Sequence, residues 1–190
     1  MSIVIVDSGG ANLTSVKNAF EKISSQAVVS IDKNIISNAD YVILPGVGSA
    51  QMVMQSLISN NLVNVIKSLT QPVLGICVGM QILFNSSEEQ NCKCLGLIND
   101  DIKKFNLPKD KAVPHMGWNK VIFESEQLLS NYYYFANSYY APITKDTTGI
   151  CEYGIEFSAT VQKDNFFGCQ FHPEKSSNSG IKFIQNFLNY

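Results

Sequence analysis

Cys77 stands between two glycines in the pentapeptide Gly75-Ile76-Cys77-Val78-Gly79, after an apolar run and before a helical pattern. This is the nucleophile-elbow pattern, in which a strand turns sharply into a helix and exposes a nucleophile, here with sulfur in place of a serine hydroxyl. A helix N-terminus favours the thiolate through its dipole and its free N–H groups. The N–H of Val78 would point toward an oxyanion formed on attack. The pentapeptide alone is equally compatible with a buried core cysteine.

His172 is one of two histidines and is followed by Pro173 and Glu174. Pro173 disfavours the helical region for the residue before it, so His172 is expected to be extended. Residues two apart on an extended chain face the same way, and Glu174 could therefore accept a hydrogen bond from one imidazole nitrogen while the other faces Cys77. A surface turn with an incidental ion pair is the alternative. Together with Cys77, the pattern predicts a nucleophile, a base and a carboxylate that orients the base.

Two further segments could complete such a site. Gln81 follows Cys77 by one helical turn, so both side chains share a helix face and the amide could hold a polar substrate. Pro45-Gly46-Val47-Gly48 offers backbone N–H groups that can be approached closely, which suits a second oxyanion donor. An ordinary strand-to-helix turn is the alternative for this segment.

Alternating strands and helices must position these groups. Continuous apolar runs predict buried strands at 3–6, 41–44 and 72–76, and helical spacing follows at 13–23, 50–58, 62–69 and 78–84. Beyond residue 100 we expect strands at 120–123, 132–135, 157–161 and 166–171, with a last helix at 180–188. We therefore predict one α/β domain over residues 1–190, with a mostly parallel sheet, helices on both faces and an antiparallel section. The turns after Val6, Leu44 and Ile76 should share the carboxyl edge, where ligands gather in such sheets.

Composition excludes several classes of protein. The chain has 190 residues, 45% hydrophobic and 16% charged, which excludes a disordered chain or a long coiled coil. Its net charge is -2, all its cations are lysines, and no basic stripe suggests nucleic acid. We expect no membrane partner, because the most apolar stretch, 73–84, is too short to span a bilayer. The five cysteines are scattered rather than arranged as a disulfide framework, which favours a cytoplasmic protein.

No cofactor or metal is expected. Cys92-Lys93-Cys94 lacks the second cysteine pair or the histidine that would complete a zinc site. The segment Asp7-Ser8-Gly9-Gly10-Ala11-Asn12 lacks both the glycine spacing and the lysine of nucleotide-binding loops, and Asn12 could simply cap the next helix.

Five motifs, in this order, make the chain similar to class I (triad-type) glutamine amidotransferases over nearly its whole length. More narrowly, it resembles the glutaminase subunits of imidazole glycerol phosphate synthases, which act in histidine biosynthesis. The motifs are Leu44-Pro45-Gly46-Val47-Gly48, Gly75-Ile76-Cys77-Val78-Gly79-Met80-Gln81, Pro114-His115-Met116-Gly117-Trp118-Asn119, Asn137-Ser138-Tyr139-Tyr140 and Gln170-Phe171-His172-Pro173-Glu174-Lys175-Ser176.

The resemblance implies a flavodoxin-like fold and a specific chemistry. Cys77 would form a γ-glutamyl thioester with glutamine, His172 would move the protons, and Glu174 would orient His172. It also implies a heterodimer with a (β/α)8-barrel cyclase that takes up the ammonia and makes imidazole glycerol phosphate and an aminoimidazole carboxamide ribotide. The backbone of Gly46, Val47 and Val78 matches the oxyanion hole, Gly48, Gln81, Ser138 and Tyr139 match glutamine-binding positions, and Asn12, His115, Trp118 and Lys175 match positions at the partner interface or site rim.

The chain departs from the family pattern in its first turn, at Asn137, where histidine is common, and at Val78, where leucine is common. The first two departures could alter partner contact or activation. Three other functions remain open from the sequence: a glutaminase that serves another synthase, a catalytically silent flavodoxin-like binding subunit, and a stand-alone cysteine hydrolase.

Overall fold

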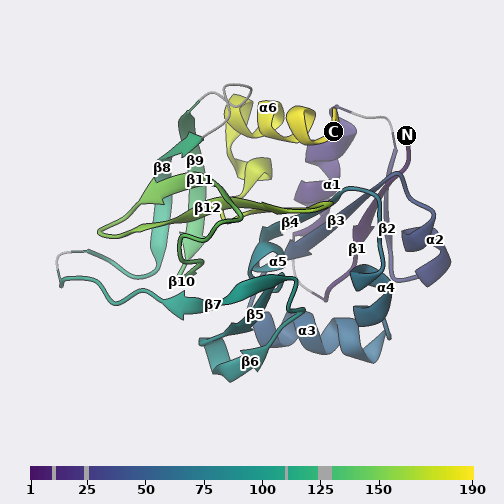
Figure 1. Ribbon diagram of the computed structural model, residues 1–190. Helices are drawn as coiled ribbons and strands as arrows, with labels where there is room; N and C mark the ends of the chain where they lie inside the picture. The colour runs from purple at the N-terminus through teal and green to yellow at the C-terminus, as the bar shows by residue number, and fades with distance from the viewer. Residues whose placement is uncertain (10–11, 24–25, 110, 124–129) are drawn as a thin grey trace.

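The computed structural model describes residues 1–9, 12–23, 26–109, 111–123 and 130–190 and is built around a large central sheet (Figure 1). The strands of this sheet are β1 (Ile3–Val6), β2 (Ala27–Ser30), β3 (Tyr41–Gly46), β4 (Val73–Cys77), β8 (His115–Phe123), β9 (Asn131–Asn137), β11 (Thr147–Glu152), β12 (Glu156–Lys163) and β13 (Phe166–Cys169). They form a nine-stranded sheet in the order β2-β1-β3-β4-β13-β12-β11-β8-β9. The pairs from β2 to β13 are parallel and the remaining pairs are antiparallel, which confirms the predicted mixed α/β architecture.

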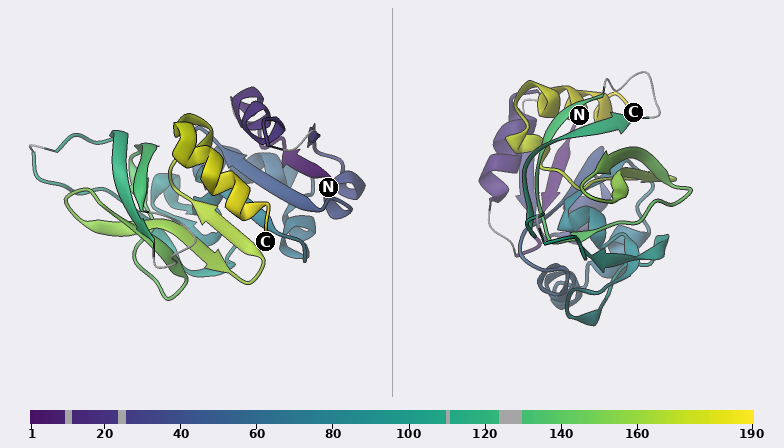
Figure 2. Two further views of the ribbon diagram at one scale, coloured as in Figure 1. Left: turned by 90° about the horizontal axis from the view of Figure 1, so that it is seen from above. Right: turned by 90° about the vertical axis from the view of Figure 1, so that its left-hand side faces the viewer.

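Helices cover both faces of this sheet. They are α1 (Leu13–Glu21), α2 (Lys33–Ser37), α3 (Ala50–Ser59), α4 (Val63–Lys67), α5 (Val78–Gln81) and α6 (Ser177–Phe187). Helices α1 and α6 lie on one face and α3 lies on the other (Figures 1 and 2). Among the described helices, none has the length and apolar character needed to cross a membrane.

A small second sheet lies beside the carboxyl edge. Its strands are β5 (Phe84–Ser87), β6 (Cys92–Lys93), β7 (Ile98–Lys104) and β10 (Tyr139–Tyr140), in the order β10-β7-β5-β6. The turn Glu89–Asn91 connects β5 to β6. Because β10 pairs with β7, the segment that carries Tyr139 is held close to the chain that follows α5.

Several details differ from the sequence predictions. The helix predicted over 78–84 is wrong beyond Gln81, because Phe84 instead pairs with Ile98 in the second sheet. The strand predicted over 166–171 ends at Cys169. It pairs with β4 in parallel and with β12 in the antiparallel sense, so it joins the two sections of the sheet. Gly10 and Ala11 of the predicted first turn lie outside the described residues.

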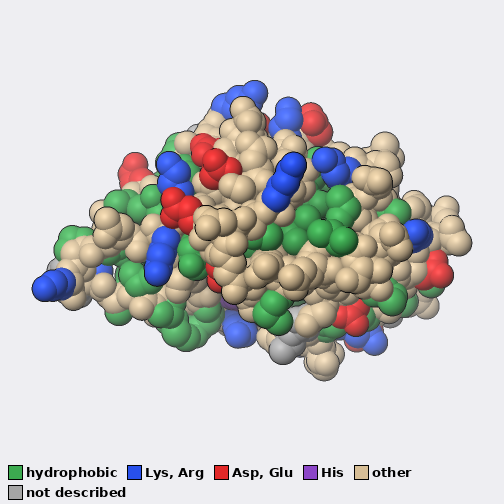
Figure 3. Space-filling view, turned by 90° about the horizontal axis from the view of Figure 1, so that it is seen from below, with side chains coloured by type: hydrophobic (Ala, Val, Ile, Leu, Met, Phe, Trp, Pro, Cys, Tyr) green, Lys and Arg blue, Asp and Glu red, His purple; other side chains and the backbone are tan. Residues whose placement is uncertain are grey.

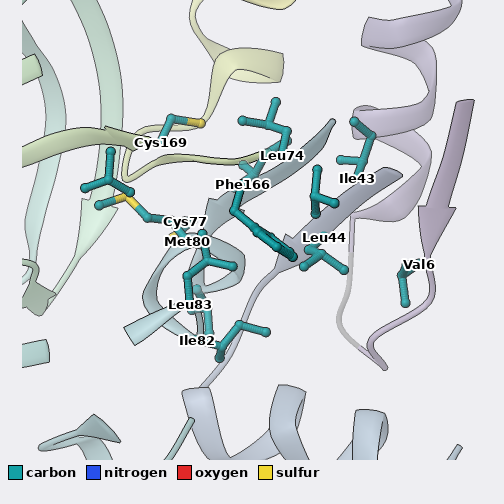
Figure 4. Packing of buried hydrophobic residues seen from close by; sticks show 14 of the residues in the cluster. Val6, Ile43, Leu44, Leu74, Cys77, Met80, Ile82, Leu83, Phe166 and Cys169 are labelled. Atoms are coloured by element: carbon teal, nitrogen blue, oxygen red, sulfur yellow. The ribbon is translucent and has the colours of Figure 1, made fainter. Parts of the chain in front are cut away.

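Apolar side chains from β3, β4 and α5 form a dense core directly beneath the elbow (Figure 4). Ile43, Leu74, Met80, Leu83 and other members of this cluster are fully buried. The surface is mixed in charge: in the view of Figure 3, lysine and acidic side chains are interspersed and neither sign gathers into one continuous patch.

At Gly79, the backbone of helix α5 closely approaches the backbone of strand β3. A Cβ at position 79 would lie 1.7 Å from the carbonyl oxygen of Leu44, a backbone atom that cannot swing aside. We expect Gly79→Ala to lower the free energy of unfolding by about 1–3 kcal/mol through overpacking, and to lower the melting temperature measured by circular dichroism. Ile58→Ala, at an exposed position of α3, is the control and should change little. Equal melting temperatures for the two variants would contradict the close packing.

Candidate active site

The chain makes its sharpest bend at Cys77. This residue ends β4 and caps α5 with φ 55° and ψ −111°, a conformation that a non-glycine residue rarely adopts. Glycines allow the bend: a Cβ at Gly75 would lie 2.4 Å from the Gly79 oxygen, and one at Gly46 would lie 2.4 Å from the Gly79 nitrogen. The strained turn predicted from the pentapeptide is therefore present, and the sulfur sits at a helix N-terminus.

The predicted oxyanion-hole residues surround this bend. Gly46 lies opposite Cys77 in the β3–β4 register, which brings the backbone of 46–48 beside the elbow. Val78 is the first residue of α5, so its N–H has no acceptor within the helix. Gly48 adopts φ 88°, a value that favours glycine.

His172 is held next to the elbow by the strand beside β4. Strand β13 pairs with β4 in parallel, with Cys169 opposite Ile76, so the chain leaves both strands at the same edge. The backbone N–H of His172 donates to the Tyr134 carbonyl oxygen at 2.8 Å, and the Ser176 hydroxyl donates to the His172 carbonyl oxygen at 2.7 Å. These bonds fix His172 from both sides.

Glu174 contacts His172, but by a different route from the one expected. Its Oε1 lies 2.9 Å from His172 Nδ1, and the two side chains are 2% and 5% exposed. His172 is extended, as predicted, at φ −99° and ψ 98°, whereas Pro173–Lys175 form a 3₁₀ turn rather than an extended segment. The carboxylate therefore folds back on the imidazole within a turn.

Glu174 occupies Nδ1 of His172, which leaves the second ring nitrogen, Nε2, available to Cys77, whose interaction with the ring is the largest one that raises the pKa of His172. Burial by itself would lower the pKa of His172. The hydrogen bond and charge of Cys77, followed by those of Glu174, outweigh burial and raise the pKa of His172 to about 10. The charged form of the imidazole is thus favoured beside Cys77.

A cavity of about 220 Å³ opens at Cys77. Its lining includes all four residues predicted to hold glutamine. The lining residues are Gly48, Cys77, Val78, Gln81, Glu89, Pro114, Ala136, Asn137, Ser138 and Tyr139. The cavity is thus formed by both sheets and by the strand ends of β8 and β9.

Glu89 was not predicted from the sequence. It lines the cavity, and its Oε2 accepts a 2.9 Å hydrogen bond from the N–H of Ala50, at the start of α3. Glu88-Glu89 in the sequence resembles any solvated acidic turn, so no local pattern distinguishes it. Only the folding of β5 and β6 onto α3 brings this carboxylate to the site.

The residues predicted at a partner interface separate into exposed and buried ones. Trp118 is 52% exposed and pairs across strands with Tyr134, whose ring lies 5.8 Å from the ammonium group of the exposed Lys175. Asn12 is partly exposed at φ 82°, and its side chain does not cap α1.

We expected His115 at the partner interface or the site rim, but the structure places it in the interior. It is only 3% exposed and its ring stacks between Tyr153, at 3.9 Å between centroids, and Phe135, at 4.8 Å. Burial, followed by the charge of Lys111, lowers the pKa of His115 to about 4, so the ring is neutral. The alternation of β8 explains the position, because His115 and Val121 face inward while Met116 and Trp118 face outward.

The described residues contain no group of three or more histidine, cysteine, aspartate or glutamate side chains that could hold a metal ion. Cys92 and Cys94 are both buried, and burial is the first cause that raises the pKa of Cys94 to about 12. All five cysteines carry free thiols.

Comparison with known proteins shows the family of the chain. Residues 4–189 match the family model described as glutamine amidotransferase class-I. The chain is 46% identical to the imidazole glycerol phosphate synthase subunit HisH of Shewanella sediminis (98% of this chain, 90% of the relative) and to that of Escherichia coli strain K12 (99% of each).

Solved structures show the same fold. A crystal structure of a glutamine amidotransferase aligns with a TM-score of 0.77 at 14% identity, over 98% of this chain and 97% of that one. A glutamine amidotransferase from Thermotoga maritima aligns with a TM-score of 0.63 at 13% identity, over 100% of this chain and 83% of that one. The chain belongs to the class-I glutamine amidotransferase family.

Proposed function

We propose that this chain is the glutaminase subunit of an imidazole glycerol phosphate synthase in histidine biosynthesis. It hydrolyses L-glutamine to glutamate and ammonia, and a cyclase subunit of (β/α)8-barrel type takes up the ammonia. The observation that carries the proposal is the buried, hydrogen-bonded His172–Glu174 pair, whose imidazole interacts with Cys77 in the cavity lining. The near full-length similarity to HisH subunits supports the choice of synthase.

The chemistry follows from the positions of the three side chains. The Cys77 thiolate attacks the side-chain amide carbon of glutamine, and the N–H groups of Val78 and Val47 stabilise the oxyanion. The His172 imidazolium protonates the departing nitrogen, the C–N bond breaks, and a thioester remains. His172 then takes a proton from water as the water attacks the thioester, and glutamate leaves as the thiolate is restored.

The cavity lining suits an amino acid. Glu89 provides a carboxylate for the α-ammonium group of the substrate, and Gln81 and Ser138 provide polar groups for its other end. Tyr139 and Gly48 also line the cavity and complete the proposed glutamine-binding set. The whole chain, 1–190, acts in this proposal as one domain in the cytoplasm, and it needs neither metal nor cofactor.

The partner is proposed to dock on the outward face of β8 and β9. Met116, Trp118, Ile122 and Tyr132 on this face are each more than half exposed, and Lys175 lies beside them over Tyr134. Exposed aromatic residues with a basic neighbour are typical of protein interfaces. The same strands end at Pro114 and Asn137 in the cavity lining, so a partner on this face is continuous with the site.

The test is ammonia release from glutamine by the isolated chain, with and without the barrel cyclase and its nucleotide ligand. We expect the partner and its ligand together to raise the rate at least about fivefold, the lower end of typical coupling between sites. Glutaminase activity that a different synthase raises, while the cyclase leaves it unchanged, would assign the chain to that synthase. Absence of hydrolysis under every condition would favour a catalytically silent role.

A further inference from the structure

A continuous series of side-chain amides runs from the cavity wall to the nucleophile. Gln81 Nε2 donates to the Tyr139 carbonyl oxygen at 3.2 Å and to Gln170 Oε1 at 2.9 Å. Gln170 Nε2 in turn donates to Cys77 Sγ at 3.7 Å. Gln81 and Gln170 are 2% and 0% exposed, so water does not compete with these bonds.

The direction of the series is set by its first acceptor. A backbone carbonyl can only accept, so the Gln81 atom that faces Tyr139 must be the nitrogen. The same nitrogen offers its second hydrogen to Gln170, which must therefore present its oxygen. The amide nitrogen of Gln170 is then the atom that faces the sulfur. The same Tyr139 oxygen also accepts a 2.9 Å hydrogen bond from Asn137 Nδ2.

We propose that Gln170 is a catalytic residue that donates a hydrogen bond to the sulfur of Cys77, stabilises the thiolate and links it to the glutamine-binding wall at Gln81 and Tyr139. The sulfur then has two buried polar neighbours, the donor Gln170 and the imidazole of His172. A fixed N–H donor strengthens when its acceptor becomes charged, and hydrogen bonds to charged groups are roughly twice as strong as neutral ones. The link to glutamine binding rests on the proposed function, whereas the effect on the sulfur does not.

A purely structural role would also explain a buried amide at this place. Gln170 could serve only as an acceptor that holds Gln81 in position. The variant Gln170→Glu distinguishes the catalytic role from the structural one. It keeps the shape of the side chain and the oxygen that accepts from Gln81, but it replaces the amide group that donates to the sulfur with an acceptor.

The experiment measures the alkylation rate of Cys77 by iodoacetamide between pH 5 and 10, followed by peptide mass spectrometry so that the other cysteines are scored separately. For Gln170→Glu we expect the rate at pH 7 to fall about tenfold, with the midpoint of the pH profile displaced upward by about one unit, the size of one charge-assisted hydrogen bond. Gln71→Glu is the matched control, because Gln71 lies before the opposite end of β4, where its amide donates to the Ile36 carbonyl oxygen. It should leave the profile unchanged.

Gln170→Met removes both donor and acceptor without adding charge, and it covers the case in which Gln170→Glu does not fold. We expect its alkylation rate at pH 7 to fall several-fold. A wild-type profile in either folded variant overturns the proposal. The outcome is independent of the proposed function: slowed alkylation in a chain that does not hydrolyse glutamine would support Gln170 and contradict the glutaminase, and unchanged alkylation in an active glutaminase would do the reverse.

Discussion

Replacing Cys77 with alanine is expected to lower glutamine hydrolysis at least about 10⁴-fold while leaving the fold intact. Loss of a nucleophile in a triad removes the covalent route altogether, and losses of this order are typical. The methyl group of alanine fits the space that the sulfur occupies, so only a modest change in melting temperature should accompany the loss. Ammonia release in the presence of the proposed cyclase partner is the measurement, because the expected activation gives the widest range between active and inactive enzyme.

Cys151→Ala is the matched control for this prediction. Cys151 is also buried, at 1% exposure, but it lies in β11 and does not line the cavity. It should retain hydrolysis near the wild-type rate even if it lowers stability slightly. Hydrolysis that persists in Cys77→Ala would show that the sulfur is not the nucleophile.

The parallel half of the sheet was predictable because its strands are buried on both faces. The runs at β1, β3 and β4 are continuously apolar, and each is almost entirely buried in the fold. Strand β2 was not predicted, because its apolar run, Ala27-Val28-Val29, is only three residues long; in the fold only Ala27 of the four strand residues is buried. Helix α2 was missed because five residues are too few to show a helical period.

Tertiary contacts decide the details that the local pattern could not. The residues 82–84 have the apolar spacing of a helix, yet Phe84 leaves the helix to pair with β7. A short apolar run does not distinguish a buried helix from a buried strand by periodicity alone. Strand β13 pairs in parallel with β4 although the antiparallel strands β8, β9, β11 and β12 lie between them in the sequence. This pairing likewise depends on contacts between distant parts of the chain.

The candidate site was predictable where its residues lie in one motif and not where they meet from afar. Cys77, His172 and Glu174 stand out through their neighbours in sequence. Gln170 receives its role from Gln81, 89 positions earlier, and from Cys77, 93 positions earlier. No spacing rule at that distance exists, so such contacts emerge only from the folded sheet.

Glu174→Gln is expected to lower the rate of hydrolysis about 10²- to 10⁴-fold with little change in stability or in substrate affinity. The Glu174 carboxylate can only accept, so it keeps the Nδ1 proton of His172 in place and leaves Nε2 for the sulfur. A glutamine amide carries no charge and can donate to Nδ1 instead. This disfavours the imidazolium that protonates the departing nitrogen, and in the neutral ring it places the proton on Nε2, which can then no longer accept a proton from water. The carboxylate is also one of the groups that hold the pKa of His172 high, so the charged form of the imidazole is less favoured without it.

The kinetic signature separates this orienting role from a role in substrate binding. An orienting carboxylate lowers kcat and leaves KM near its wild-type value, whereas a substrate ligand raises KM. Glu152→Gln, at an exposed carboxylate that pairs with Lys111, is the control and should leave both constants unchanged. A rise in KM alone would show that Glu174 is not the orienting carboxylate.

Glu89→Gln should give the opposite kinetic pattern, because Glu89 lines the cavity and Glu174 does not. We expect a raised KM with a smaller loss in kcat when the same measurement is made on this variant.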